Sequence, residues 1–278
     1  MRTAVIGHVE WVEYASVERV PAPGEIVGAR RTWVEPAGGG AVAAVQLARL
    51  AGECTLYTAL GDDEIGARAR EGLERLGVDV RSVTRAGEPT RRAFTFVDDA
   101  GERTITVIGR RLQPDRGDPL PWDELRGVDA VYFTAGDPDA LRAARDARVL
   151  GATARTMDAI EAAAVPLDAV VGSGRDPGER YRAFDPPPRL VVTTAGAAGG
   201  AWQGSEGRTG RWAAAPVPGP VGDAYGCGDS FAAGFTFGLA AFDGDVQRAL
   251  ELGARCGATC LTGHGAYERQ LTASALQR

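Results

Sequence analysis

Hydrophobic and polar positions follow two different periods along the chain, and the first of them predicts a mostly parallel sheet. Short apolar runs of strand length alternate with segments whose apolar residues recur at helical spacing. The predicted strands are 3–9, 54–60, 130–134, 169–172 and 190–194, and the predicted helices are 41–51, 64–76, 138–149, 230–241 and 246–261. This alternation is typical of an α/β fold with a doubly wound sheet flanked by helices.

Two stretches alternate with period two instead, which is typical of exposed antiparallel ribbons. The clearer one runs over 93–107, where an Asp/Gly turn at 98–101 joins two short strands into a hairpin. The other covers roughly 12–34. We expect the two ribbons to pair as a small β lid, formed by 12–34 and 91–109, over a cleft in a single domain of 1–278. A third hairpin over 200–213 is predicted as an edge ribbon.

Composition limits the partners that this domain could have. The chain has 278 residues, of which 44% are hydrophobic and 24% charged, as in ordinary globular proteins. No apolar run reaches the 18 or so residues of a membrane span, and the N-terminus reads as a buried strand, so a cytoplasmic protein without a membrane partner is expected. A net charge of −6 argues against nucleic acid as a partner. The four scattered cysteines are predicted to be reduced core residues.

Every basic residue apart from two histidines is arginine, because the chain contains no lysine. A Walker-type phosphate loop, a protein kinase and Schiff-base chemistry all require a lysine, so these classes are excluded. The two histidines, His8 and His264, are too few for a His-rich zinc site or a two-histidine iron site.

One motif carries the candidate chemistry, a glycine-rich turn over 223–229 that opens a helix of small residues. Glycines at 226 and 228 allow the backbone N–H groups of Gly226, Cys227 and Gly228 to close on phosphate oxygens, and the helix N-terminus adds about half a positive charge. This predicts an anion hole that needs no lysine. Asp229, at its mouth, could accept the proton of an attacking hydroxyl. The helix terminus is expected to depress the pKa of Asp229, which makes it a weak base that mainly orients the hydroxyl.

This turn resembles the D-T-x-G-A-G-D signature of ribokinase-like sugar kinases, also called the phosphofructokinase-B type, with Ala224 and Cys227 as substitutions. The segments 36–50, 61–66 and 76–79 are similar to further family segments, and the hairpin at 93–107 matches the family's lid, so the resemblance covers nearly the whole chain.

The resemblance implies an ATP-dependent kinase that transfers the γ-phosphoryl group to a hydroxyl of a small sugar or sugar-like molecule, with Asp229 as the catalytic base. It implies nucleotide binding by Thr194, Gly196, Gly199, Ala254, Gly257 and His264. For Mg²⁺, held through water, it implies Asp176, which stands in an altered N-x-x-E element. For K⁺, which some family members bind, it implies Asp223 and the carbonyl of Tyr225.

Departures from the family lie where sugar hydroxyls would bind. Val12 stands in place of an aspartate, Glu10 where an asparagine is common, and Val42 in place of another asparagine. The candidate acceptor-binding residues are therefore Glu10, Val12, Gly38, Gly39, Gly40, Val42 and Arg92. Ribose and fructose are both in doubt as substrates, because sugar specificity depends on such hydrogen-bonding groups.

Two alternative functions stay open at this stage. A nucleoside kinase of the same fold could use the apolar residues Trp11, Val12 and Val42 to accept a base. A family member that binds ligands without catalysis would also explain the lost polar residues. A serine hydrolase with Ser230 as nucleophile is disfavoured, because the proline-rich segment before the turn cannot form a central strand. The lid edges could also pair between subunits to make a homodimer.

Overall fold

Nine strands form the larger sheet, sheet A, in the computed structural model, which describes residues 1–276. Their order is β13-β12-β11-β10-β9-β8-β1-β4-β5. The parallel strands are β1 (Thr3–Ile6), β4 (Cys54–Gly61), β5 (Val78–Arg85), β8 (Ala130–Phe133), β9 (Val149–Thr153), β10 (Ala169–Ser173) and β11 (Leu190–Thr194). An antiparallel edge is added by β12 (Gly200–Gly204) and β13 (Thr209–Trp212).

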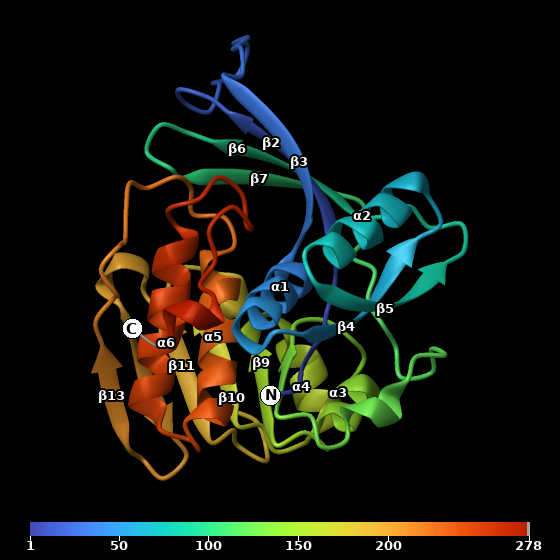
Figure 1. Cartoon of the computed structure of the whole chain (residues 1–278), viewed down its shortest axis with the longest axis vertical. Helices are drawn as coiled ribbons and strands as arrows, with labels where there is room; N and C mark the ends of the chain where they lie inside the picture. Colours follow the sequence, from blue (N-terminus) through green and yellow to red (C-terminus); the bar gives the residue numbers. More distant parts are fainter. Residues whose placement is uncertain (277–278) are drawn as a thin grey trace.

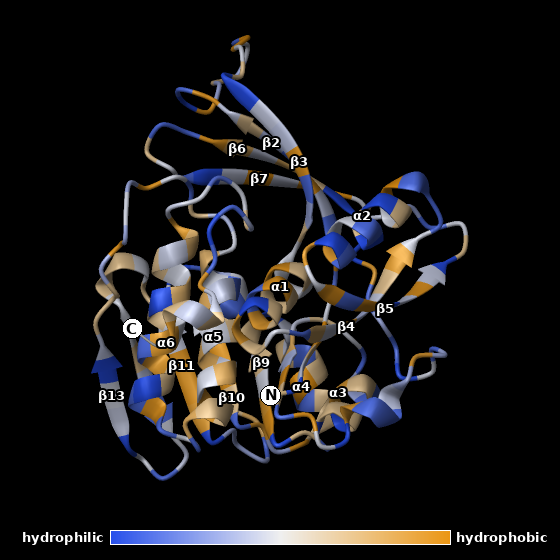
Figure 2. Ribbon diagram, viewed as in Figure 1, coloured by the Kyte–Doolittle hydropathy of each residue, from blue (hydrophilic) through white to orange (hydrophobic). Residues whose placement is uncertain are grey.

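Helices cover both faces of sheet A (Figure 1). On one face lie α1 (Gly39–Ala51), α5 (Cys227–Ala241) and α6 (Val246–Cys260), and on the other α3 (Pro138–Ala144) and α4 (Met157–Ala163). Successive side chains of β1 point to opposite faces of the sheet, and those of Ala4, Val5 and Ile6 are all apolar, so both faces must be covered by helices. Val5 joins the core under α1 and α5, whereas Ala4 and Ile6 join the core under α3 and α4. The central strands accordingly consist mainly of hydrophobic residues (Figure 2).

A smaller sheet, sheet B, stands beyond one end of sheet A (Figure 1). It consists of β2 (Glu10–Ser16), β3 (Arg31–Ala37), β6 (Arg92–Val97) and β7 (Arg103–Ile108), in the order β3-β2-β6-β7. Strands β2 and β6 pair in parallel, so the two ribbons that the sequence suggested form one sheet. All six residues of β7 are exposed at its outer edge. Dimerisation through this edge stays a prediction.

Helix α2 (Glu64–Arg75) packs between β5 and sheet B. Its N-cap, Asp63, accepts hydrogen bonds from Gly66 N–H at 2.8 Å, from Thr90 N–H at 2.9 Å and from the Thr90 hydroxyl at 2.6 Å. Asp63 therefore holds in place both the N-terminus of α2 and Thr90, the residue before Arg91. Short 3₁₀ helices lie at Trp122–Leu125, Ala154–Thr156, Pro177–Glu179, Gly196–Ala198 and Ala273–Ala275.

The predicted fold class is confirmed, and one element prediction needs correction. The segment 138–149 is not one helix, because α3 ends at Ala144 and Val149 begins β9. Strand β5 and helix α4 were not predicted. Among residues 1–276, no helix has both the length and the apolar composition needed to cross a membrane. Cys54, Cys256 and Cys260 are buried thiols.

Candidate active site

The turn at 223–229 leads directly into α5, and its two glycines have different roles. Gly226 has a left-handed backbone, with φ of 76°, and a Cβ there would meet Val42 Cγ1 at 3.0 Å. Only glycine fits this position without strain. The space above Gly228 is open instead, because no atom from outside its own turn of helix lies within 4 Å of the point that a Cβ would occupy. The N-terminus of α5 is thus accessible to an anion at Gly228.

Asp229 lies in the first turn of α5 and is only partly exposed. Burial raises the pKa of its carboxyl group to about 6, and the negative charge of Glu179 adds to this, while Arg103 and Arg155 work in the opposite direction. The expected depression of this pKa is therefore wrong, because burial outweighs the helix terminus. A carboxylate with such a pKa is ionised at neutral pH and is a better proton acceptor than an ordinary aspartate. Its neighbour is Gly39, where a Cβ would come 3.0 Å from Asp229 Oδ1.

His8 and Glu10 lie beside Gly38 and Gly39 at the junction between β1 and β2, and both are more than 90% buried. Their closest side-chain atoms, His8 Nε2 and Glu10 Oε1, are 3.5 Å apart. Burial lowers the pKa of His8, which favours the neutral ring. Burial acts to raise the pKa of Glu10, but His8, Arg91 and Arg111 more than offset it, so the pKa of Glu10 is lowered. Glu10 is therefore a buried anion whose charge is felt by Asp229.

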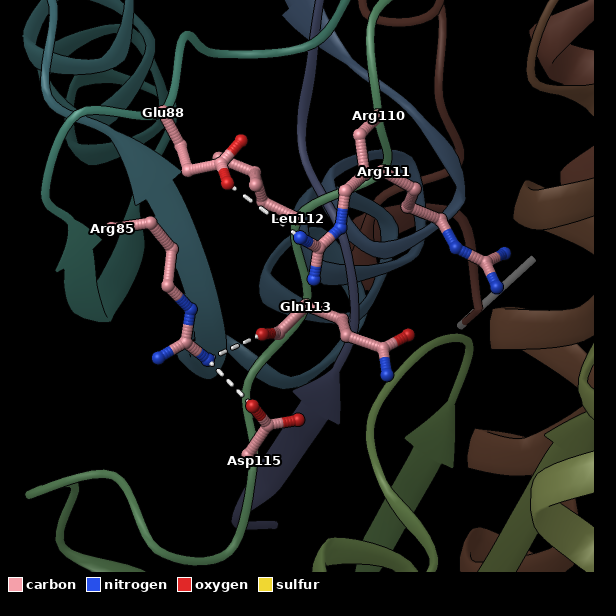
Figure 3. A pocket seen from close by; sticks show the side chains of 7 residues that line it. All are labelled: Arg85, Glu88, Arg110, Arg111, Leu112, Gln113 and Asp115. Carbon is pink, nitrogen blue, oxygen red and sulfur yellow. Dashed lines mark hydrogen bonds and ion pairs between the residues drawn. The ribbon is translucent and has the colours of Figure 1, made fainter.

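Two arginines face Glu10. Arg91 Nε lies 3.1 Å from Glu10 Oε1 and forms an ion pair with it. Arg111 comes from the loop after β7 and is partly buried, and burial together with the charges of Arg91 and Arg155 lowers its pKa. Figure 3 shows that Arg110 points toward Glu88, with which it pairs at 3.6 Å, whereas Arg111 points away from both. Within residues 1–276, Arg111 forms no ion pair.

A pair of carboxylates follows the carboxyl end of β10. Asp176 caps the short helix Pro177–Glu179 by accepting from Gly178 N–H at 2.8 Å. Arg155, which follows β9, bridges Asp176 at 2.6 Å and Glu179 at 2.5 Å. The predicted metal residue Asp176 therefore has a partner, Glu179, that the sequence motif did not indicate. The two carboxylates and their single arginine leave one negative charge uncompensated.

The predicted nucleotide-binding residues surround the nearby end of sheet A. Thr194 ends β11, and Gly196 and Gly199 flank the turn that follows, both with positive φ. Gly257 on α6 faces the start of α5, because a Cβ there would lie 3.1 Å from the carbonyl of Cys227. Ala254 is buried on the same helix, and His264 is exposed in the next loop.

Asp223, which is buried, and Glu35, which is partly buried, form an acidic region behind the turn. Asp223 accepts from Tyr225 N–H at 2.8 Å and from Gly265 N–H at 2.6 Å, and Glu35 of β3 accepts from Ala266 N–H at 2.7 Å. Burial raises the pKa of Glu35 to about 7, and the charge of Asp223 contributes. The Cys260 thiol donates a hydrogen bond to the Tyr225 carbonyl, with an Sγ–O distance of 3.4 Å.

Three of the predicted acceptor-binding residues, Val12, Val42 and Arg92, have other surroundings than the sequence suggested. Val12 and Val42 are completely buried core residues, so they offer no open apolar surface to a nucleobase. Arg92 pairs with Glu13, and it is Arg91 that lies next to Glu10. Ser230 is fully buried and accepts a hydrogen bond from Gln270 Nε2 at 3.2 Å, so it cannot be an accessible nucleophile. His8 was not predicted, although it follows the carboxyl end of a central strand, where ligands of α/β sheets bind.

Comparison with known proteins identifies the family of the chain. The model of the pfkB family of carbohydrate kinases matches residues 2–169 and 180–273. The chain is 32% identical over 288 residues, covering 96% of this chain and 94% of the relative, to an ATP-dependent ribose-1-phosphate kinase of Halopiger xanaduensis.

Solved structures share the fold. A putative ribokinase from Agrobacterium tumefaciens has a TM-score of 0.80 at 20% identity, covering 99% of this chain and 96% of its own. A ribokinase from Cryptococcus neoformans in complex with ADP has a TM-score of 0.76 at 22% identity, covering 99% of this chain and 98% of its own. The chain belongs to the pfkB family of carbohydrate kinases and is an ATP-dependent phosphotransferase with a hydroxyl group as acceptor.

Proposed function

We propose that the acceptor is a pentose that already carries a phosphate group, with ribose 1-phosphate as the first candidate. The observation that carries this proposal is the 32% identity, over nearly the full length of both chains, to an ATP-dependent ribose-1-phosphate kinase. A neutral sugar would need the hydrogen-bonding side chains that Val12 and Val42 do not supply.

The charges on the acceptor side support a phosphorylated substrate. Arg91 compensates the buried anion Glu10, and Arg111 adds a positive charge that no carboxylate within residues 1–276 neutralises. A partly buried arginine without an anion is costly, and a phosphate dianion with its bidentate geometry would relieve this cost. Glu10 and His8 would then bind the pentose hydroxyls.

The chemistry follows from the position of Asp229. Its carboxylate accepts the proton of the acceptor hydroxyl, whose oxygen attacks the γ-phosphorus of ATP as the bond to the β,γ-bridging oxygen breaks and ADP leaves. The N–H groups of Gly226, Cys227 and Gly228 would hold the oxygens of the transferred phosphoryl group. Thr194, Gly196, Gly199, Ala254, Gly257 and His264 stay as the proposed nucleotide contacts.

Magnesium would be held by Asp176 and Glu179 together with nucleotide phosphates. Mg²⁺ needs only one or two protein carboxylates, and this pair has one negative charge in excess of Arg155, so the donor chemistry fits. When bound, Mg²⁺ neutralises charge on the β- and γ-phosphates. A monovalent cation such as K⁺ at Asp223 and the Tyr225 carbonyl is a further proposal.

An acceptor screen tests the proposed function. ATP consumption is measured with ribose 1-phosphate, ribose 5-phosphate, ribose, fructose and adenosine, each with Mg²⁺ and with or without K⁺. The highest kcat/KM is expected for a pentose phosphate. A higher kcat/KM for ribose or adenosine would overturn the proposed acceptor, and no turnover with any of them would favour a binding protein without catalysis.

Substitutions of Arg111 and of its neighbour Arg110 form a matched pair that tests the proposed phosphate contact. Arg111→Gln should raise KM for ribose 1-phosphate by about 10- to 100-fold, because a charge-assisted hydrogen bond contributes about 1.5 to 3 kcal/mol. Arg110→Gln, which changes the adjacent arginine that points to Glu88, should leave this KM within about threefold. Equal effects of the two substitutions would contradict the proposed role of Arg111.

A further inference from the structure

Two of the four cysteines meet behind the anion hole. Cys227 is the first residue of α5, and Cys260 is the last residue of α6. The Cys260 sulfur lies 3.4 Å from the carbonyl oxygen of Tyr225, and the Cys227 sulfur lies 3.9 Å from the carbonyl oxygen of Asp223. The two thiols also form a hydrogen bond with each other. Both sulfur atoms therefore contact the turn at 223–229 as well as each other.

The packing of α5 against α6 holds the two thiols in this position. Glycines let the helices come close, because a Cβ on Gly257 would stand 3.1 Å from the Cys227 carbonyl oxygen and one on Gly253 would stand 2.8 Å from the Phe231 carbonyl oxygen. Gly257 and Cys260 are three residues apart on α6, so they share one face of the helix. Helix packing, and not a loop, thus directs Cys260 at the first turn of α5.

The other two cysteines have different surroundings. Cys256 packs against α5 at Gly234, where a Cβ would come 2.5 Å from the Cys256 sulfur. Cys54 begins β4 and is buried, as Cys256 is. Cys227 is partly exposed instead, beside the open space above Gly228. The D-T-x-G-A-G-D signature has alanine in the place of Cys227, so this thiol is an addition to the shared phosphate-binding turn.

We propose that Cys227 and Cys260 are a modification site, at which a hydroperoxide such as hydrogen peroxide forms a reversible disulfide that inactivates the enzyme. The Cys227 thiolate attacks one peroxide oxygen and breaks the O–O bond, which gives a sulfenic acid and, after protonation of the leaving hydroxide, water. The sulfur of Cys260 then attacks the sulfenic sulfur, and its proton leaves with the hydroxyl group as a second water molecule. A reducing thiol restores both cysteines and is itself oxidised to a disulfide.

The disulfide acts on the phosphate side of the site. An S–S bond is about 2.0 Å long, shorter than any hydrogen bond, so its formation must draw the first residue of α5 and the end of α6 together. The N–H group of Cys227 is one of the three proposed to hold the transferred phosphoryl group, and displacements of about 1 Å strongly reduce the effect of such groups.

The reaction should be slow at neutral pH. The hydrogen bond with Cys260 and burial raise the pKa of Cys227, so the reactive thiolate is scarce. The rate of disulfide formation should therefore increase by about tenfold per pH unit between pH 7 and 9, because the thiolate fraction increases by this factor.

Peptide mapping tests the modification without any assay of activity. The reduced protein is treated with hydrogen peroxide at pH 8, and its peptides are compared by mass spectrometry before and after dithiothreitol. A peptide that joins Cys227 to Cys260 is expected before dithiothreitol and not after it. Cys256→Ala, which removes the thiol one helical turn from Cys260, is the matched control and should form the same joined peptide. Absence of this peptide from the unmodified protein would overturn the inference.

The effect on activity rests on the proposed function. Disulfide formation should lower kcat/KM for ATP by at least about tenfold, and dithiothreitol should restore it. In Cys260→Ser the sulfenic acid has no partner and is oxidised further to sulfinic acid, so dithiothreitol should not restore the activity lost to peroxide. Each protein is compared with its own reduced form.

The Kd for ATP, measured without an acceptor, separates the two proposals. It should be at least about tenfold higher for the disulfide form than for the reduced form. A joined protein in which both kcat/KM and this Kd are unchanged would contradict the inference. If the reduced protein turns over no acceptor, the proposed function fails, while the joined peptide and the Kd for ATP still decide the inference.

Discussion

The backbone of Gly39 lies against the carboxylate of Asp229, so that a methyl group on Gly39 would stand 3.0 Å from Oδ1. Gly39→Ala should therefore displace the Asp229 carboxylate and lower kcat by about 10- to 100-fold, because small displacements of a catalytic group have effects of this size. Steady-state kinetics measures this decrease in kcat. Gly117→Ala, with no atom within 4 Å of its Cβ position, is the control and should retain full activity.

Asp229 should give the reaction an acidic limb in its pH dependence. Since the pKa of Asp229 is raised to about 6, its basic form is lost as the pH falls through 6. We expect kcat/KM to level off above pH 7 and to fall about tenfold per pH unit well below 6. Asp229→Asn should lower kcat by about 100- to 10,000-fold at pH 8. An Asp229→Asn protein with unmodified turnover would contradict the assignment of the base.

Substitution of Glu179 should change both the Mg²⁺ requirement of the reaction and the pKa of Asp229. Glu179→Gln should raise the Mg²⁺ concentration needed for half-maximal activity, because one of two proposed carboxylate ligands is lost. It should also shift the acidic limb to lower pH, since the charge of Glu179 raises the pKa of Asp229. Glu161→Gln, on α4 and paired with Arg182, is the control. An unchanged Mg²⁺ requirement in Glu179→Gln would exclude this residue as a ligand.

Glu35 should make the protein less stable at neutral and higher pH than in weakly acidic solution. The pKa of Glu35 is raised from 4.5 to about 7 in the folded state, so the folded state binds this proton more tightly than the unfolded state does. The free energy of unfolding should therefore decrease as the pH rises from about 4.5 to 7, by up to about 3 kcal/mol. Glu35→Gln cannot ionise and still offers an acceptor to Ala266 N–H. Urea unfolding should find it more stable than the unmodified protein at pH 8.5 and similar at pH 5.

The fold was largely predictable because its central strands are buried on both faces. Strand β11 has the predicted bounds 190–194, and α1 begins two residues earlier than predicted. Strand β5 escaped prediction because it is the edge of sheet A: Val78 and Val80 are buried, but Asp79 and Arg81 face solvent, so the strand lacks an apolar run.

The site was predictable only where a motif specifies it. The turn at 223–229 indicated Asp229 as the candidate base, but no motif distinguishes Arg91 from Arg92 or Arg110 from Arg111. Neighbouring residues of an extended segment point to opposite sides, and which side faces the site depends on the register of β2 against β6, where Trp11 lies opposite Arg92. Glu179 and Arg103 likewise reach the site through contacts between segments far apart in the sequence.

The continuation of β1 into β2 has a thermodynamic consequence. His8 and Glu10 lie at the joint between sheet A and sheet B, and Arg91 at the entry to β6, while Gly101 and Arg103 at the other end of sheet B rest on the nucleotide side. Sheet B thus extends from the proposed acceptor site to the proposed nucleotide site. If its closed position is favoured by either substrate, then ATP and the acceptor must each increase the affinity of the other by the same factor, with sheet B as the element through which their binding is linked.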